Sequence, residues 1–243
     1  MVKILLLCGD TNRAKSYASI LKNKTKIHLI GLLYGIEKRE SHNSIINIDA
    51  NTKEYLNSIE VEIPELNKDI ESIFKDNQWD YSLVKEKNVN DVEIINKIKS
   101  VDCDFVVFAG YGGQILTKEH FLQGKKYVHC HPGWLPLERG STTLYYSLLN
   151  NRKLSVTSFF MTEKIDEGNM ILRKSYPSPK KQINIDIWAD NALRADTLSR
   201  SIELFQNNYT GFSRDTKEED QEYYVIHPLL KHISLLSLKQ KNL

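Results

Sequence analysis

Continuous apolar runs alternate with helical spacings along the first half of the chain. Lys3–Cys8, Ile27–Leu33 and Asp104–Ala109 consist almost entirely of apolar residues, which is typical of strands buried on both faces of a parallel sheet. A polar loop and a helical spacing over about 13–21 separate the first two runs. This β-α-β order predicts an α/β, Rossmann-like fold with a mainly parallel, doubly wound sheet.

The rest of the chain gives shorter or weaker patterns. Short strands are predicted at Tyr81–Val84, Lys126–His131, Val156–Met161 and Met170–Tyr176. Helices are predicted after Asn90, after Ser141 and over 183–206, where apolar residues recur at helical spacing. The segments Ser44–Ile48 and Ile59–Ile63 look β-like because they are rich in isoleucine and valine.

Composition narrows the class of protein. The chain has 243 residues, 41% hydrophobic and 26% charged, with a net charge of +2; such a balance predicts neither a nucleic acid nor an anionic membrane as partner. No apolar segment approaches the roughly 20 residues that cross a bilayer. Cys8, Cys103 and Cys130 are scattered and form no CxxC motif. We therefore expect a cytoplasmic protein without disulfides.

Three loops follow predicted strands, at the sheet edge where open α/β proteins bind ligands. They are Gly9–Asn12, Gly110–Gln114 and His131–Gly140. Glycine in such a loop permits positive φ and a close approach of the backbone to a ligand. Gly112 and Gly113 could equally form an ordinary turn.

Two histidines and one aspartate are the candidate chemical groups. His129 and His131 are two residues apart near a strand end, so they should face the same side while Cys130 faces the other. Asp166 lies in a turn further along the chain, and a carboxylate beside an imidazole stabilises the imidazolium. The alternatives are that one histidine satisfies a buried carbonyl and that Asp166 is an exposed turn residue.

Two segments together resemble the signature of the folate-dependent formyltransferases. His129–Gly140 reads HCHPGWLPLERG and Ile165–Ile171 reads IDEGNMI, similar to the family pattern N-x-H-x-S-x-L-P-x-x-x-G followed by D-x-G. The resemblance covers residues 1–176 and implies a catalytic domain there, followed by a small C-terminal helical and β extension over 177–243. It implies transfer of a formyl group from N10-formyltetrahydrofolate to an amine, with no metal and with His131 and Asp166 as catalytic residues.

The chain departs from the family pattern at two positions. His129 stands where the family has a catalytic asparagine, and Gly133 stands where it has serine. A neutral imidazole can donate one hydrogen bond, as the amide would, and it can also accept a proton. We expect the hydrogen-bond role for His129, with proton transfer, or another residue supplying the donor, as alternatives.

The resemblance also implies binding residues. Phe108–Leu116 is similar to the folate-side loop of the family, which implies cofactor contacts from Phe108, Tyr111, Gly112, Gly113, Ile115 and Leu116. Asn88–Asp91 is similar to a segment of the sugar-modifying branch. For that branch, the expected substrate contacts, at the pyrophosphate, come from Asn12, Arg13, Lys85 and Asn88.

The acceptor follows from features outside the signature. The tail from Tyr223 to His232 resembles the sugar-nucleotide N-formyltransferases, some of which serve O-antigen and lipopolysaccharide biosynthesis, and the chain lacks a strongly basic C-terminal region. We expect a nucleotide-linked amino-deoxysugar, such as a dTDP-4-amino-4,6-dideoxyhexose, and possible homodimers. The alternatives are methionyl-tRNA or a small metabolite as acceptor, a metal-dependent hydrolase using the three candidate groups, and a non-catalytic folate or nucleotide binding module.

Overall fold

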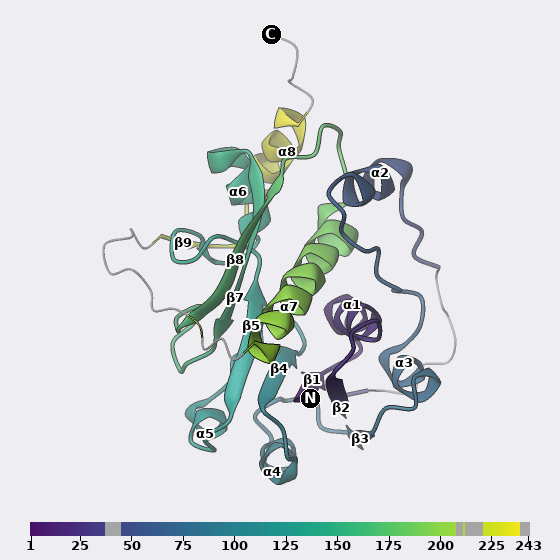
Figure 1. The fold of residues 1–243 in the computed structure, drawn as a ribbon. Helices are drawn as coiled ribbons and strands as arrows, with labels where there is room; N and C mark the ends of the chain where they lie inside the picture. Colours follow the sequence, from purple (N-terminus) through teal and green to yellow (C-terminus); the bar gives the residue numbers. More distant parts are fainter. Residues whose placement is uncertain (37–44, 208–210, 212–220, 239–243) are drawn as a thin grey trace.

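The computed structural model describes residues 1–36, 45–207, 211 and 221–238. A seven-stranded sheet crosses the molecule in the order β3-β2-β1-β4-β5-β7-β8 (Figure 1). The pairs β3–β2, β2–β1, β1–β4 and β4–β5 are parallel, whereas β7 pairs antiparallel with both β5 and β8. This confirms the predicted α/β fold with a mainly parallel sheet. The strands are β1 Val2–Cys8, β2 Ile27–Tyr34, β3 Tyr81–Val84, β4 Phe105–Ala109, β5 Lys126–His131, β7 Lys153–Phe160 and β8 Met170–Pro177.

The central strand β1 shows why the apolar runs predicted the sheet. Its alternate residues enter two different buried clusters, Leu6 on one face and Leu5 on the other. Both side chains are fully buried, as expected for a strand covered by helices on both faces. The predictions of interior strands at 3–8 and 104–109 are therefore confirmed, because β1 and β4 each have a strand on both sides.

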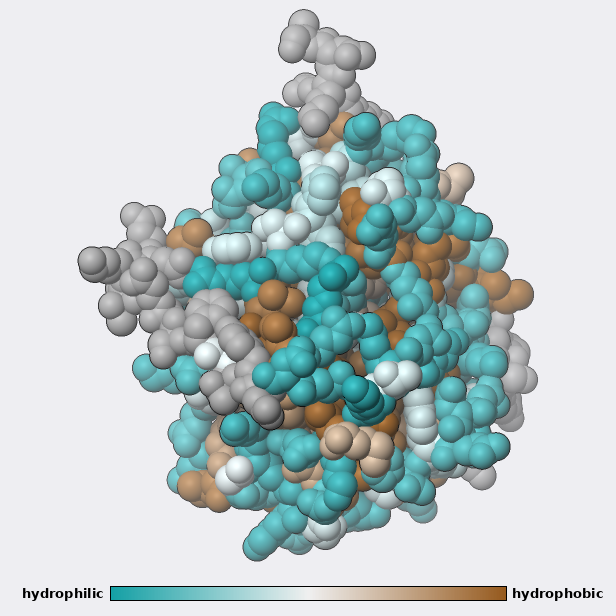
Figure 2. All heavy atoms as spheres, viewed as in Figure 1, coloured by the Kyte–Doolittle hydropathy of each residue, from teal (hydrophilic) through white to brown (hydrophobic). Residues whose placement is uncertain are grey.

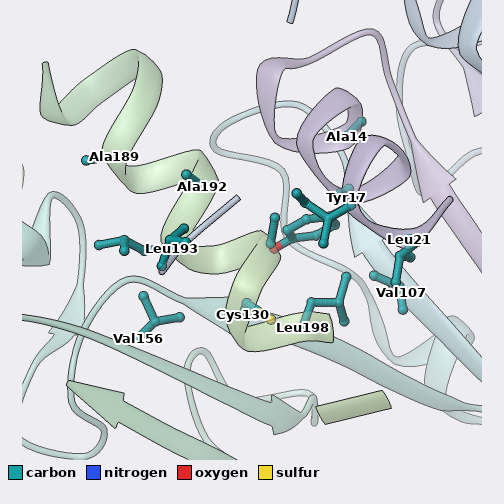
Figure 3. Close-up of a cluster of buried hydrophobic side chains, with 14 of the residues drawn as sticks. Ala14, Tyr17, Leu21, Val107, Cys130, Val156, Ala189, Ala192, Leu193 and Leu198 are labelled. Atoms are coloured by element: carbon teal, nitrogen blue, oxygen red, sulfur yellow. The ribbon is translucent and has the colours of Figure 1, made fainter. Parts of the chain in front are cut away.

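Helices form the outer layers. On one face α1 and α7 lie side by side, and Tyr17 of α1 packs in the same buried cluster as Leu193 and Leu198 of α7 (Figures 1 and 3). On the other face Ile94 and Ile98 of α4 cover the sheet. The helices are α1 Asn12–Leu21, α2 Ala50–Ser58, α3 Ile70–Asp76, α4 Val92–Ser100, α5 Lys118–Phe121, α6 Thr143–Asn151, α7 Asp190–Gln206, preceded by a π-helical turn at Ile185–Ala189, and α8 Pro228–Ser237.

The region between β2 and β3 differs from its predicted pattern. Residues 59–63 form a turn and an extended segment, not a strand, and Val61 is buried in the main core. Of the segment Ser44–Ile48, Ser44 lies outside the described residues and 45–48 form no strand. The apolar residues of these segments pack against the core. They form no strand, and the place beside β2 at the sheet edge is taken by β3.

Residues beyond 176 extend the fold in two ways. The helix α7 packs against α1, β5, β7 and β8. A second, two-stranded parallel sheet pairs β6, Arg139–Gly140, with β9, Glu222–Tyr223. The division of the chain into a domain at 1–176 and an extension at 177–243 stays a prediction.

The surface is mixed. The face in Figure 2 is mainly hydrophilic, with apolar side chains gathered beside α2. No helix in the described part of the chain is both long enough and apolar enough to span a bilayer.

Candidate active site

The strand β5 carries both candidate histidines. Cys130 is fully buried in the main core, between the two, so His129 and His131 face the opposite side of the sheet, as the strand alternation predicts. The antiparallel neighbour β7 pairs Phe159 with His129 and Thr157 with His131. Pairing of β5 with β7 therefore fixes the backbone at both histidines.

His131 and Asp166 form a buried pair. Nδ1 of His131 lies 3.4 Å from Oδ1 of Asp166, and the two side chains are only 3% and 11% exposed. Nε2 of the same ring lies 2.5 Å from the carbonyl oxygen of Glu138. Both neighbours of the ring are acceptors, an arrangement that suits a ring with a proton on each nitrogen. The expected approach of His131 to Asp166 is present in the structure.

A tight turn presents Asp166 to the histidine. Asp166 has a positive φ of 53°, and two residues on Gly168 has a φ of 141°. A Cβ at Gly168 would stand 1.9 Å from the Phe160 carbonyl oxygen, so only glycine fits there. This gives the aspartate–x–glycine spacing a steric reason.

The Asp166 carboxylate is held in its charged form. Burial alone would raise the pKa of Asp166, but the charge and hydrogen bond of His131, together with the Gly140 N–H, lower that pKa well below its usual range. The Gly140 N–H donates to Oδ2 over 3.0 Å. A buried charge pair costs free energy unless hydrogen bonds satisfy its remaining atoms, and here both partners have such a bond.

The loop from His131 to Gly140 is built around a second buried carboxylate. Glu138 is 1% exposed, and its carboxylate accepts hydrogen bonds from Trp134 N at 2.7 Å, from the Ser147 hydroxyl and from Asn151 Nδ2 at 3.2 Å. These bonds tie the loop to α6. They also fix the Glu138 carbonyl that accepts from His131. The local sequence of the loop gives no sign that Glu138 holds the loop against α6, and we did not predict this role.

The same loop explains the glycine that replaces the family serine. A Cβ built on Gly133 would lie 2.7 Å from the Glu138 carbonyl oxygen and 2.9 Å from His131 Nε2. Real Cβ atoms do not approach this closely, so the bond between His131 and Glu138 O leaves no room for a side chain at position 133. The two features therefore belong together.

His129 is held neutral by its surroundings. Burial, followed by the positive charges of Arg13 and Arg194, lowers the pKa of His129 well below its ordinary value. Its Nδ1 lies 3.4 Å from the Phe108 carbonyl oxygen, and a carbonyl can only accept, so Nδ1 carries the proton. Nε2 of the neutral ring then has a free lone pair. This tautomer leaves an acceptor, where the family asparagine would offer an amide donor.

Two arginines concentrate positive charge beside His129. Arg13, on α1, donates from Nη2 to Gly110 O at 2.5 Å, while its buried Nε has no hydrogen-bond partner among the described residues. Arg194, on α7, donates to Asp190 at 2.8 Å and to Cys130 O at 3.3 Å. Burial and then the charge of Arg194 lower the pKa of Arg13. Arg194 is thus paired with a carboxylate, whereas Arg13 donates to a backbone carbonyl. We did not predict Arg194, because only the packing of α7 on α1 and β5 brings it here.

The folate-side loop divides into core and surface residues. Phe108 and Leu116 are buried in the second core cluster, and the Tyr111 hydroxyl donates to Gly35 O at 2.8 Å. At Gly112 and Gly113 a Cβ would meet no atom within 4 Å, and Ile115 is 55% exposed. Gly112, Gly113 and Ile115 therefore form an open, partly apolar surface. In the sequence this surface comes a few residues after Phe108, whose carbonyl His129 contacts.

The four predicted substrate residues do not form one cluster. Asn12 and Arg13 begin α1, whereas Lys85 and Asn88 are exposed in the loop after β3. That loop reaches the Gly110–Gln114 loop, where Gln114 Nε2 donates to Lys87 O at 2.6 Å. Within the described residues, no hydrogen bond or ion pair joins Lys85 or Asn88 to Arg13.

Two cavities lie away from this site. One of about 170 Å³ is next to Lys22 and Asp76, and one of about 370 Å³ is next to Asp186 and Lys231; neither is lined by a residue predicted for catalysis. In the part of the chain that the structure describes, no three His, Cys, Asp or Glu side chains are grouped to hold a metal ion.

Comparison with known proteins identifies the family. The formyl transferase family model matches residues 34–182. Methionyl-tRNA formyltransferase of Clostridium acetobutylicum is 38% identical over 87 residues, 35% of this chain and 27% of its own length. The enzyme of the same name from Finegoldia magna is 25% identical over 164 residues, 66% of this chain and 51% of its own length. The chain thus spans between about a quarter and a half of these curated relatives.

A solved structure extends the likeness of fold to nearly the whole chain. The sugar N-formyltransferase of a Shewanella species superposes with a TM-score of 0.59 at 17% identity, covering 98% of this chain and 88% of its own. At such low identity the likeness concerns the fold. Since the family model matches well over half of its residues, the chain belongs to the formyl transferase family.

The buried Glu138 generates the first testable prediction. Glu138→Ala removes the acceptor of three donors, so we expect the free energy of unfolding to fall by about 3 kcal/mol. Denaturant titration measures this loss, with Glu163→Ala at an exposed position as the control, expected within about 0.5 kcal/mol of wild type. Equal stability of the two variants would contradict the structural role.

Proposed function

We propose that the chain transfers a formyl group from N10-formyltetrahydrofolate to the amino group of a nucleotide-linked amino-deoxysugar. The observation that carries this proposal is the buried His131–Asp166 pair, with its 3.4 Å contact, two residues along the strand from a neutral His129. Acyl transfer to an amine needs a charged donor for the developing oxyanion and a group that takes the amine proton. The two histidines have different protonation states that suit these two tasks.

His131 is the proposed donor. As the neutral amine attacks the formyl carbon, the carbonyl oxygen becomes negative, and the imidazolium of His131 stabilises it. In this proposal the formyl oxygen shares the Nε2–H with Glu138 O, while Asp166 stays beside Nδ1. Asp166 stays charged throughout, because its lowered pKa lies far below neutral pH.

His129 is the proposed proton acceptor. Its neutral Nε2 takes the proton that the attacking amine loses when the new C–N bond forms. The bond from the formyl carbon to the folate nitrogen then breaks, and that nitrogen receives the proton back from His129 Nε2, which returns the ring to its neutral state. Protons and electron pairs balance without a metal or an oxidant.

The binding residues support a nucleotide and a folate. Arg13 and Arg194 bind a phosphate of the nucleotide sugar, since Asp190 pairs with Arg194 while the charge of Arg13 is left over. The open surface at Gly112, Gly113 and Ile115 suits the planar folate ring. In this proposal Lys85 and Asn88 contact the more distant parts of the substrates.

Two further aspects belong to the same proposal. The structural neighbour from Shewanella is a sugar N-formyltransferase, and it shares the fold beyond residue 182, where the family model ends. The three cysteines are free, which supports a reducing, cytoplasmic location. A role in lipopolysaccharide biosynthesis and a homodimeric state remain part of the proposal.

A panel of acceptors tests the function. The purified protein is incubated with N10-formyltetrahydrofolate and, separately, with nucleotide-linked amino sugars, glycinamide ribonucleotide and methionyl-tRNA, and products are read by mass spectrometry. We expect a formyl mass gain on a nucleotide sugar, and turnover lower by about 100-fold or more for His131→Ala and Asp166→Asn. Formylation of methionyl-tRNA alone, which the curated relatives suggest, would overturn the sugar assignment.

The role of His129 gives a separate prediction. If Nε2 accepts the amine proton, His129→Asn should lower kcat by about 100-fold. The acid limb of the pH–rate profile should also vanish, since the wild-type enzyme loses activity as the pH falls through the lowered pKa of His129. The rate at saturating folate across pH measures both effects. If His129→Asn keeps most of the activity while His129→Ala loses it, the ring serves as a hydrogen-bond donor instead.

The positive charge of Arg13 and Arg194 leads to a third prediction within the proposed function. Arg194→Ala should raise KM for the nucleotide sugar by about 10-fold or more, the value of one charge-assisted hydrogen bond. It should also move the acid limb to higher pH, because the charge of Arg194 lowers the pKa of His129. Arg200→Ala, on the same helix and bound to Asp196, is the matched control. An unchanged KM and profile in Arg194→Ala would remove it from the site.

A further inference from the structure

We infer that the C-terminal segment 221–238 is a positioning element of the active site, and that Tyr223 acts through Gly140 to hold Asp166 against His131. This inference rests on the proposed function only for its effect on turnover; the contact itself is a property of the fold. The family model ends at residue 182, so it does not include the segment.

The backbone of β6 connects the segment to Asp166. Arg139 N donates to Gln221 O and Ser141 N donates to Tyr223 O, each over 2.9 Å. The intervening Gly140 N–H does not bond to β9 but donates to Asp166 Oδ2 over 3.0 Å. Because the N–H groups on either side of it are held by β9, the pairing sets the direction of this backbone bond to the carboxylate.

The contact at Gly140 is too close for any other residue. Gly140 has a φ of 100°, and a Cβ there would stand 2.1 Å from Tyr223 O. The glycine of the signature therefore meets two demands here, a left-handed backbone and the close approach of the C-terminal segment. The close contact with Tyr223 therefore involves a residue of the sequence motif itself.

Thr142, two residues after Gly140, is held in an unfavourable conformation by the same segment. Thr142 has a φ of 53°, which is an outlier for a β-branched residue. Its hydroxyl accepts from Ile226 N at 2.8 Å and donates to Ser141 O at 2.7 Å. Such backbone conformations persist only where surrounding contacts determine them, and the segment provides one of these contacts.

Side chains anchor the segment to α6. The ring of Tyr223 stacks on Tyr146, with 4.2 Å between the centroids, and its hydroxyl accepts from Asn150 Nδ2 at 2.8 Å. Further along, α8 packs on α6, where Ser234 Oγ donates to Tyr145 O at 3.2 Å. Tyr224, next to Tyr223, is 83% exposed and offers a matched position outside the contact.

The first experiment measures the contact without any substrate. Amide hydrogen exchange at Gly140 is followed by NMR in wild type, Tyr223→Ala, Tyr223→Phe and Tyr224→Ala. Loss of the stack should speed exchange at Gly140 by about 10-fold or more in Tyr223→Ala, the value of roughly one hydrogen bond. Tyr223→Phe keeps the stack and should stay close to wild type, as should Tyr224→Ala. Unchanged exchange in Tyr223→Ala overturns the inference.

The second experiment measures the consequence for turnover. In Tyr223→Ala we expect kcat to fall by about 10-fold, with both KM values within about twofold of wild type, because a loosened Asp166 affects the transition state more than substrate binding. Tyr223→Phe should restore kcat, which a general loss of folding would not allow. Faster exchange at Gly140 with an unchanged kcat overturns the positioning role. If wild type formylates no acceptor, the proposed function fails, and the exchange result alone decides the contact.

Discussion

The burial of the His131–Asp166 pair is the constraint on which the surrounding structure depends. Two charges taken out of water lose their hydration, and their mutual attraction compensates only if the remaining atoms are hydrogen-bonded. Asp166 therefore needs the Gly140 N–H, and the second N–H of His131 needs the Glu138 carbonyl. Each of these backbone groups must in turn be fixed. The loop, α6 and the C-terminal segment all serve that requirement.

The loop is fixed from two sides by different means. Inside, the Glu138 carboxylate binds donors of the loop and of α6, so the carbonyl of the same residue cannot shift independently. Outside, β9 pairs with β6 and leaves Gly140 no freedom to turn. Removing either support exposes the charged pair to reorganisation. This is why small residues at 133 and 140 accompany the charged residues of the loop.

The sequence predicted those parts of the protein that depend on local pattern. The apolar run of β1, the strand β5 and the pairing of His131 with Asp166 follow from alternation and from a motif. Residues 59–63 were wrongly assigned because burial against a core and pairing in a sheet favour the same side chains. Arg194 and the role of Tyr223 could not be predicted, because each reaches the site through long-range packing that no nearby residue signals.

Burial and nearby positive charge keep His129 neutral at its position beside Asp166. An asparagine amide is neutral at every pH, whereas an imidazole beside the Asp166 carboxylate would tend to become charged. Burial and the charges of Arg13 and Arg194 outweigh that effect, and they lower the pKa of His129 well below its usual value. If the substrate is a nucleotide sugar, as we propose, the same positive charge suits its phosphate. A phosphate bound there would weaken the effect of the arginines on His129 and raise its pKa, which makes the ring a more effective proton acceptor. On that proposal, substrate binding and the basicity of His129 are coupled through the two arginines.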